Sequence, residues 1–402
     1  MHRAMRSIPS LLARAPPPLV IEVRDARVPF TSINPNFEKV LQNAPSAAER
    51  VRVGRDTIVP GWAARRLVVY TKRDHIDHKM EKPIRLALAE HTHDKDVMFV
   101  DTRKRADVKN VYQWVCERAK LLQKAAAKAA SRTSKSLRHS RLSGAARHTS
   151  TPETGVRMLI VGMPNVGKSS LINALRFVGT GKASAASTHP HPGHTRKVTG
   201  TVRITPDPPS LPELDMEQTI DMKALVARQA QRGPAVYVYD TPGIMVPYLG
   251  SYQDGGPERA LKLAITGCIK QALFDVEELA DYLLFRLNQR YRHALQRGDT
   301  SLPPYTTIMN RPRPTDDIKT YLSDVAKRAP GARQQGGTFS TDVAAEYMLA
   351  QFRRGLLGSR ELDLALDEDL ASLHNPTSLN EQVTARLEHF LLGPSDNMHE
   401  VS

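Results

Sequence analysis

Cysteine and long apolar runs are scarce in this sequence of 402 residues. The two cysteines, Cys116 and Cys268, lie far apart, so they provide neither a disulfide framework nor the four ligands of a structural zinc site. No run of 18 apolar residues occurs, so the sequence predicts no membrane-spanning helix. A chain of this length can instead hold two domains with ordinary hydrophobic cores.

Acidic residues are outnumbered as well, by 57 Lys and Arg to 42 Asp and Glu, which gives a formal charge of +15 and a pI near 9.8. The stretch 118–148 carries nine Lys or Arg and no acid. This balance favours a polyanionic partner, RNA or an anionic membrane surface, although a merely soluble basic protein has the same composition. The basic stretch is either an arm that contacts RNA or a solvated linker.

A complete Walker A loop, G-x-x-x-x-G-K-[ST], runs from Gly162 to Ser169. The apolar run Met158–Val161 supplies a strand before it, and the segment from Ser170 onward supplies a helix after it. In such a loop backbone N–H groups surround phosphate, Lys168 reaches the β- and γ-phosphates, and the Ser169 hydroxyl binds Mg²⁺. The sequence therefore predicts a nucleoside triphosphate site that includes Asn165, Val166, Gly167, Lys168, Ser169 and Ser170.

A second phosphate element follows the strand predicted at Tyr237–Tyr239 and reads Asp240-Thr-Pro-Gly243. In GTPases the acid of this motif holds Mg²⁺ and the glycine N–H senses the γ-phosphate. Thr195, in a polar loop between the two motifs, is a candidate second Mg²⁺ hydroxyl. The predicted metal ligands are Ser169, Thr195 and Asp240, with Gly243 as the phosphate sensor.

The motif that reads guanine, commonly an Asp in Asn-Lys-x-Asp at a strand end, does not follow residue 243. A similar tetrapeptide, Thr71-Lys-Arg-Asp74, follows the strand predicted at Leu67–Tyr70 instead. The next strand, Val97–Val100, ends in Asp101-Thr-Arg103, where a second base-contacting loop would stand. By itself the tetrapeptide could be a solvated turn, but its position predicts a base site made of Thr71, Lys72, Arg73, Asp74, Asp101 and Thr102.

This order, base motif before phosphate motif, resembles the circularly permuted GTPases of the YlqF/RbgA family. The segment Glu22–Pro29 with Asn34-Pro35, the Walker A and DTPG motifs, Thr266–Lys270 and Phe352–Gly358 all match that family's pattern. One departure is Thr71, which stands where the family has Asn. Because Asp74 is kept, we expect guanine selectivity to survive with some loss of loop rigidity.

The resemblance implies an α/β fold: a circularly permuted P-loop GTPase domain, with a mostly parallel sheet and flanking helices, followed by a small all-helical domain. We predict the first domain at residues 1–255, with a basic linker at 118–155 and an insertion at 205–234. Helical periodicity at Val276–Leu287, Asp342–Arg353 and Thr384–Leu392 predicts a helical domain at 256–402. The resemblance implies that this domain binds rRNA.

The residue after the DTPG motif is Ile244, where Ras-like enzymes have the Gln that orients the attacking water. The resemblance offers His2 in its place, although a frayed terminal residue is an equal reading, and it implies that Asn165 helps hold K⁺. We therefore predict His2 and Lys168 as catalytic residues, with GTP, Mg²⁺ and K⁺ as ligands. Because His2 fits the family spacing, we expect any targeting presequence to lie outside this sequence.

The resemblance implies a slow GTPase that binds a large ribosomal subunit and its rRNA during assembly. The basic balance, the departures from the bacterial pattern and the low-complexity insertions favour the mitochondrial branch, with the mitochondrial large subunit as the partner. We expect it in the mitochondrial matrix or on the matrix face of the inner membrane, associated peripherally at most, with no obligate oligomer. Two alternatives remain open: a P-loop ATPase or small-molecule kinase, and a nucleotide-sensing RNA-binding scaffold with little turnover.

Overall fold

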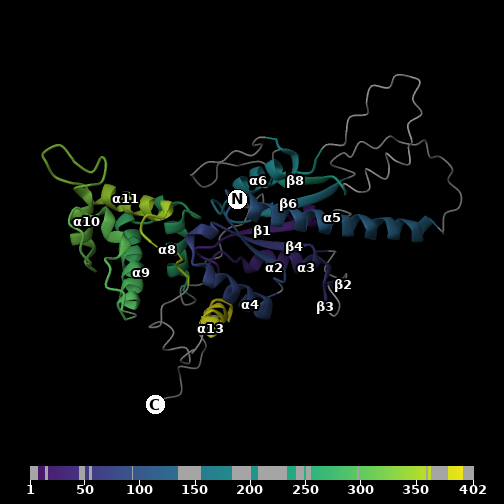
Figure 1. Ribbon diagram of the computed structural model, residues 1–402, viewed down its shortest axis with the longest axis horizontal. Coiled ribbons are helices and arrows are strands. Elements are labelled where there is room, and N and C mark those ends of the chain that lie inside the picture. The colour runs from purple at the N-terminus through teal and green to yellow at the C-terminus, as the bar shows by residue number, and fades with distance from the viewer. Residues whose placement is uncertain are drawn as a thin grey trace, which may run out of the picture.

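The computed structural model describes residues 8–13, 17–44, 50–53, 57–92, 94–134, 155–182, 201–206, 233–240, 249, 255–296, 298–358, 361–363 and 379–392. Most of the strands form one six-stranded sheet in the order β5-β4-β1-β6-β8-β7 (Figure 1). The strands are β1 (Leu19–Asp25), β4 (Arg66–Thr71), β5 (Val97–Val100), β6 (Val156–Val161), β7 (Thr201–Arg203) and β8 (Val236–Asp240). All neighbours in this sheet are parallel except β7, which pairs antiparallel with β8.

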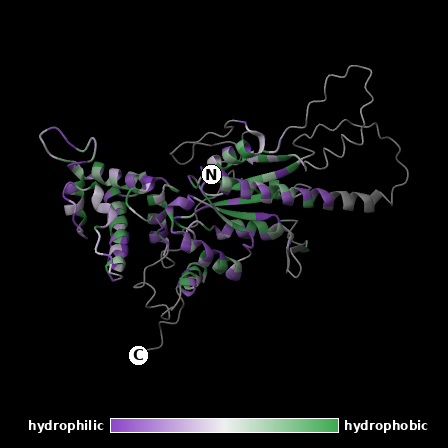
Figure 2. Cartoon of the chain, in the orientation of Figure 1, coloured by the Kyte–Doolittle hydropathy of each residue, from purple (hydrophilic) through white to green (hydrophobic). Residues whose placement is uncertain are grey.

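The parallel strands are apolar because helices cover both faces of the sheet (Figure 2). Alternation along β4 shows the two faces: Leu67 and Val69 join one buried cluster, whereas Val68 and Tyr70 join another. The first cluster includes side chains of α5 (Arg105–Ser134) and α6 (Lys168–Thr180), which also pack on each other. The second includes side chains of α4 (Glu81–His91).

Smaller elements complete this part of the chain. Helix α2 (Pro35–Gln42) begins at Asn34, whose side chain accepts from the N–H groups of Asn36 and Phe37, and it buries Phe37 and Leu41. The remaining elements are the hairpin of β2 (Arg50–Val53) and β3 (Thr57–Pro60), the short helix α3 (Gly61–Ala64), and the 3₁₀ turns η2 (Arg73–His75) and η3 (His78–Met80).

The C-terminal part is helical, and its described residues contain one isolated β-bridge and no named strand. Helices α8 (Gly256–Thr266), α9 (Val276–Gln296), α10 (Ile318–Ala326) and α11 (Thr341–Arg354) surround one buried cluster that includes Ile265, Leu283, Tyr321 and Phe352. The 3₁₀ turns η4 (Gln271–Leu273) and η5 (Pro304–Ile308) connect them. The sheet and the helical region observed here confirm the predicted fold class.

The structure differs from the sequence expectation for the last helix. The helix expected within the bundle at Thr384–Leu392 is α13 (Leu379–Leu392), and it packs on α4, where Val383 and Leu387 are buried beside Ile84. Periodicity predicts that a helix has an apolar face but does not say which neighbour covers that face. The division between residues 255 and 256 stays a prediction. Helix α8 lies after this division, yet its Leu263 belongs to the first buried cluster, the one that includes Leu67 and Val69 of β4.

Two segment boundaries also change. Helix α5 continues to Ser134, so the predicted linker 118–155 begins inside a helix, and residues 135–154 lie outside the described part. Of the predicted insertion 205–234, residues 207–232 lie outside it too; Thr205 belongs to the body of the protein, because its hydroxyl accepts from Val236 N at 3.0 Å.

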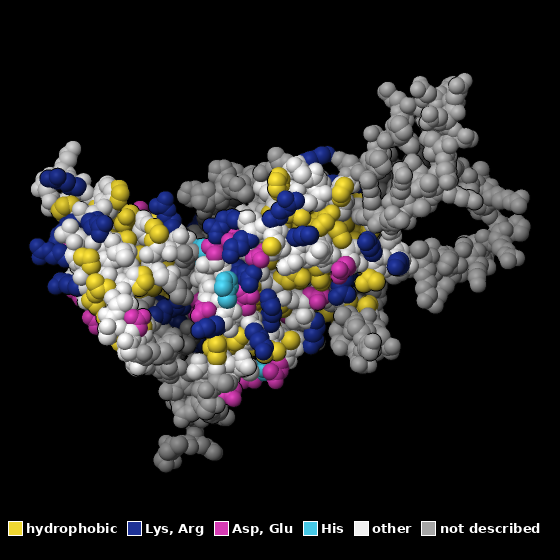
Figure 3. Space-filling view, in the orientation of Figure 1, with side chains coloured by type: hydrophobic (Ala, Val, Ile, Leu, Met, Phe, Trp, Pro, Cys, Tyr) yellow, Lys and Arg dark blue, Asp and Glu magenta, His cyan; other side chains and the backbone are white. Residues whose placement is uncertain are grey.

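Within the described residues no helix combines the length and the apolar composition needed to cross a bilayer. On the face shown in Figure 3, Lys and Arg side chains lie over both the helical part and the part that contains the sheet. The basic composition is therefore visible on more than one region of the surface.

Candidate nucleotide-binding site

The predicted motifs meet because they follow neighbouring parallel strands. The base tetrapeptide follows β4, the Walker A loop follows β6, and β1 lies between these two strands. Asp25, the last residue of β1, pairs in register with Thr71 of β4. Ligands of open α/β sheets bind beyond the carboxyl ends of the strands, so this edge is where a nucleotide is expected.

The Walker A loop has the geometry of a phosphate-binding turn. Gly162 has φ +150°, and a Cβ there would stand 2.3 Å from the Val23 carbonyl oxygen, so only glycine fits. Helix α6 begins behind Gly167, which has φ +98° and no side chain to accept from the first-turn N–H groups. The Lys168 ammonium is buried and donates to the Met163 carbonyl across the loop at 2.5 Å. These N–H groups and this ammonium suit an anionic ligand.

The base tetrapeptide is tied directly to that loop. The Thr71 hydroxyl donates to the Val166 carbonyl, and Lys72 Nζ donates to the Asn165 carbonyl at 2.8 Å. Thr71, which stands where the family has Asn, therefore contacts the Walker A loop, and the expected loss of rigidity stays a prediction. In the described part of the chain, the non-glycine residues with left-handed φ are Lys72 and Asn165, and both belong to this contact.

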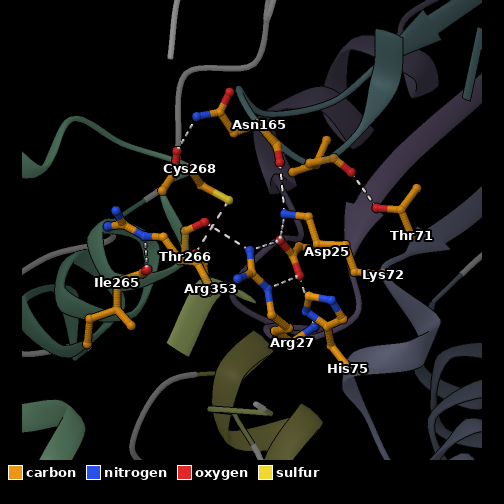
Figure 4. A network of polar contacts seen from close by, with 12 residues as sticks. Asp25, Arg27, Thr71, Lys72, His75, Asn165, Ile265, Thr266, Cys268 and Arg353 are labelled. Atoms are coloured by element: carbon orange, nitrogen blue, oxygen red, sulfur yellow. Dashed lines mark hydrogen bonds and ion pairs between the residues drawn. The ribbon is translucent and has the colours of Figure 1, made fainter. Parts of the chain in front are cut away.

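Asp25 is the centre of a buried polar network (Figure 4). Its carboxylate accepts from Arg27 NH2 at 2.7 Å and from Lys72 Nζ at 2.6 Å. Burial opposes ionisation of Asp25, but the charges of Arg27 and Lys72 outweigh burial and hold its pKa well below the ordinary value. Burial and the nearby Arg27 lower the pKa of Lys72, while Asp25 opposes that change. The carboxylate thus orients the lysine that reaches the Walker A loop.

The same network extends to the end of α8. Arg27 NH2 donates to the Thr266 carbonyl at 2.9 Å, and Asn165 Nδ2 donates to the Gly267 carbonyl at 2.9 Å. Arg353 of α11 donates to the carbonyls of Ile265 and Ala264 at 2.8 and 2.9 Å (Figure 4). The Walker A loop therefore contacts the helical region through backbone carbonyls at the end of one helix.

Asp74 and Asp101 are joined by Arg103. Its guanidinium forms two hydrogen bonds with Asp101, at 2.9 and 3.1 Å, and an ion pair of 2.6 Å with Asp74. The hydrogen bond with Asp101 and the charge of Asp74 raise the pKa of Arg103 above its ordinary value. Thr102 is half-buried in the turn between Asp101 and Arg103. The two predicted base loops are therefore brought together, with a cation at their junction.

Arg73, which the sequence predicts at the base, forms ion pairs with two acids, and its role at the base stays a prediction. Its side chain forms ion pairs with Glu81 at 2.6 Å and Asp107 at 3.1 Å, and Asp107 also accepts from Asp101 N at 2.9 Å. Arg73 therefore connects its loop to α4 and α5. Sequence reasoning assigned no role to Arg27, Gly267 or Arg353, although all three lie in segments that match the family's pattern.

Some predicted residues cannot be placed. Asp240 ends β8 and pairs in register with Ile160, one residue before the end of β6, but its side chain is outside the described atoms. His2, Thr195 and Gly243 lie outside the described residues. Ser169 is half-buried and Ser170 exposed in the first turn of α6. The roles of these residues stay predictions.

Comparison with known proteins finds GTPases among those similar to this chain. The family model described as "50S ribosome-binding GTPase" matches residues 157–312. "Mitochondrial GTPase 1" of Schizosaccharomyces japonicus is 29% identical over 87% of this chain and 84% of its own length. "Mitochondrial ribosome-associated GTPase 1" of Xenopus tropicalis is 27% identical over 86% of each chain. Residues 157–312 thus match a GTPase family model, the relatives that cover most of this chain are named GTPases, and in this sequence the base motif precedes the phosphate motif.

Among solved structures, GNP-bound YlqF from T. maritima is 17% identical, with a TM-score of 0.41 over 89% of this chain and 95% of that one.

The residues of the present chain fit a guanine nucleotide: an uncapped helix N-terminus behind Gly167, a buried Lys168, and a carboxylate on the base loop. The Ser169 hydroxyl, in the first turn of α6, is an oxygen ligand of the kind that Mg²⁺ prefers.

Proposed function

We propose that this GTPase acts in the mitochondrial matrix, where its GTP-bound form binds the large ribosomal subunit and its rRNA during assembly and hydrolysis releases it. The names of its relatives support the location and the partner, since they are mitochondrial and, in Xenopus tropicalis, ribosome-associated. The formal charge of +15 suits a polyphosphate partner. The same charge suits an anionic membrane, so peripheral association with the inner membrane is part of the proposal.

The observation that carries guanine recognition is the contact between the two motifs. Lys72 Nζ lies 2.8 Å from the Asn165 carbonyl oxygen, so the loop with Asp74 and the loop with Lys168 form one site despite being 94 positions apart. In this site we assign Asp74 to the N–H groups of guanine and Lys168 to the β- and γ-phosphates. Thr71, Lys72, Asp101 and Thr102 support the base loops.

The hydrolytic roles complete the proposal. Ser169, Thr195 and Asp240 would hold Mg²⁺, which neutralises charge on the phosphates when bound. Gly243 would sense the γ-phosphate. Ile244 cannot orient water, so that task is assigned to His2, and K⁺ beside Asn165 would spread charge in the transition state.

Phosphate release with and without purified mitochondrial large subunits tests the proposal. We expect slow intrinsic turnover, stimulation by the subunit, and tighter subunit binding with a non-hydrolysable GTP analogue than with GDP. Subunit binding that is insensitive to nucleotide and produces no turnover would instead support an RNA-binding scaffold. Binding should also fall steeply with salt because counterions are released from rRNA.

Base recognition has its own test. Asp74→Asn should change the preferred base from guanine to xanthine. The carboxylate accepts two hydrogens of the base, whereas the amide of Asn accepts with its oxygen and donates with its nitrogen. Asp77→Asn is the matched control, since Asp77 is exposed and accepts from Lys79 N in the adjacent turn. Retained GTP-over-XTP preference in the Asp74 variant would remove Asp74 from the base site.

A further inference from the structure

The carboxylate that we assign to guanine already has two partners on one oxygen. Arg103 NH2 lies 2.6 Å from Asp74 Oδ2, and His75 Nε2 lies 3.1 Å from the same atom. A carboxylate oxygen offers about two acceptor sites. Arg103 and His75 therefore fill the acceptor capacity of Oδ2.

Guanine presents two parallel N–H donors, from N1 and the 2-amino group, to the two oxygens of such a carboxylate. One of these donors needs a site on Oδ2, so one of the present partners has to leave. The side chain of His75 is 14% exposed, whereas that of Arg103 is 71% exposed. The exposed guanidinium can move into water with little loss of packing, so it is the partner that guanine displaces.

Arg103 is also held ready to return. Asp101 accepts from the backbone N–H of Arg103 at 3.0 Å and from its Nε at 2.9 Å, and neither contact involves Asp74. Displacement therefore breaks the ion pair of Arg103 Nη2 with Asp74 and moves that nitrogen relative to Asp101 Oδ2, to which it donates at 3.1 Å, while the Nε hydrogen bond keeps the side chain beside the site. A guanidinium carries the same kind of paired N–H donors as the guanine edge, which makes it a chemical mimic of the base.

We propose that Arg103 is an internal competitor of guanine for Asp74, and that this competition weakens nucleotide binding and speeds nucleotide exchange. The inference rests on the proposed role of Asp74. The competition also gives Arg103 a role in specificity. A base with a single N–H donor can use the other oxygen of Asp74 and does not need Oδ2, which Arg103 and His75 occupy. Hypoxanthine is such a base, since it keeps N1–H and lacks the 2-amino group.

Dissociation constants for GDP and IDP, measured on the full chain, test the proposal with three proteins. In Arg103→Gln we expect GDP to bind about two- to fivefold more tightly, the range for loss of one exposed ion pair. IDP affinity should not change, so the preference for GDP over IDP should rise by the same factor. Lys104→Gln, which removes the same charge from an exposed neighbour, should match the wild type for both nucleotides.

Weaker GDP binding in Arg103→Gln would mean that the side chain stacks on or supports the base, and it would overturn the competitor role. Equal gains for GDP and IDP, or no change in either, would do so too. Failure of the proposed base site is distinguishable: if Asp74→Asn does not acquire xanthine preference, the assignment of Asp74 falls. If it does, adding Arg103→Gln to that variant should leave XDP affinity unchanged, because the ion pair is already lost.

Discussion

Strand β1 carries two buried ion clusters, and they differ in what their donors contact. In the first, Glu22, Arg24, Arg66 and Asp94 form a closed ring, in which each guanidinium contacts both carboxylates. In the second, Asp25 pairs with Arg27 and Lys72, whose other donors reach carbonyls of Thr266 and Asn165. The ring is closed among side chains, whereas the second cluster joins other segments.

This difference separates stabilisation from function. All four side chains of the ring are at most 3% exposed, and its four ion pairs join ring members only to one another, not to residues of the Walker A loop. A buried cluster in which every charge faces an opposite charge fixes the relative position of its strands. The Asp25 cluster contacts the nucleotide loop and α8, so changes to it should affect binding more than folding.

Opening the ring should produce the largest loss of stability. Glu22→Gln leaves Arg24 and Arg66 with one carboxylate between them and should lower the free energy of unfolding by about 3–5 kcal/mol. Urea unfolding measures this change. The folded fraction should bind GDP as the wild type does, and Glu90→Gln, at an exposed position on α4, is the control. A specific loss of GDP affinity would contradict the separation.

Changing the Asp25 cluster should produce the reverse result. Lys72→Met removes the cation between Asp25 and the Asn165 carbonyl and keeps the aliphatic stem. We expect GDP affinity to fall about tenfold or more, since a charge-assisted hydrogen bond contributes roughly 1.5–3 kcal/mol. Calorimetric titration measures it. Lys79→Met, at an exposed lysine of η3, should have no effect; a Lys72 variant that binds normally would show that the tie between the loops is dispensable.

The link from the Walker A loop to α8 should matter less for stability. Asn165→Gly keeps a residue that tolerates φ 56° and removes the hydrogen bond to Gly267, at a cost of about 1 kcal/mol in unfolding free energy. Hydrolysis rates in K⁺ and Na⁺ at equal ionic strength give a second measurement. We expect K⁺ stimulation in the wild type and none in the variant; stimulation that persists would assign the ion to other ligands.

A partly exposed cluster between α8 and α13 should show the smallest effect. Burial opposes ionisation of Glu258, but Lys262 and Arg386 outweigh it and lower its pKa from 4.5 to about 2. The folded pKa is depressed, so the stabilisation is complete above pH 4.5 and is lost as the pH falls towards 2. The Glu258 side chain is 40% exposed, so solvent screens this contribution.

Urea midpoints between pH 5 and pH 2 for Glu258→Gln, with Glu278→Gln as the exposed control, measure that contribution. The Glu258 variant should lose less stability on acidification than the wild type and the control do. Identical pH curves for all three proteins would mean that the ion pairs of Glu258 add nothing.

The sequence was most informative where local pattern and chemistry coincide. The apolar run Val97–Val100 is a strand with the same bounds, and the Walker A loop lies between β6 and α6 as its flanks predicted. Both depend on residues that are close in the chain, so periodicity and glycine positions suffice. Arg73 shows the limit: the tetrapeptide predicted it at the base but did not predict its ion pairs with Glu81 and Asp107.

The sequence by itself determined that a Walker A loop and a base motif are present, in permuted order, on a basic chain. Only the tertiary structure decided that Lys72 contacts Asn165, that Arg103 covers Asp74, that α8 touches the Walker A loop, and that α13 packs on α4. The reason is physical. A motif's chemistry lies in neighbouring residues, but buried charges and apolar faces find partners through strand order and burial, which join positions far apart in the chain.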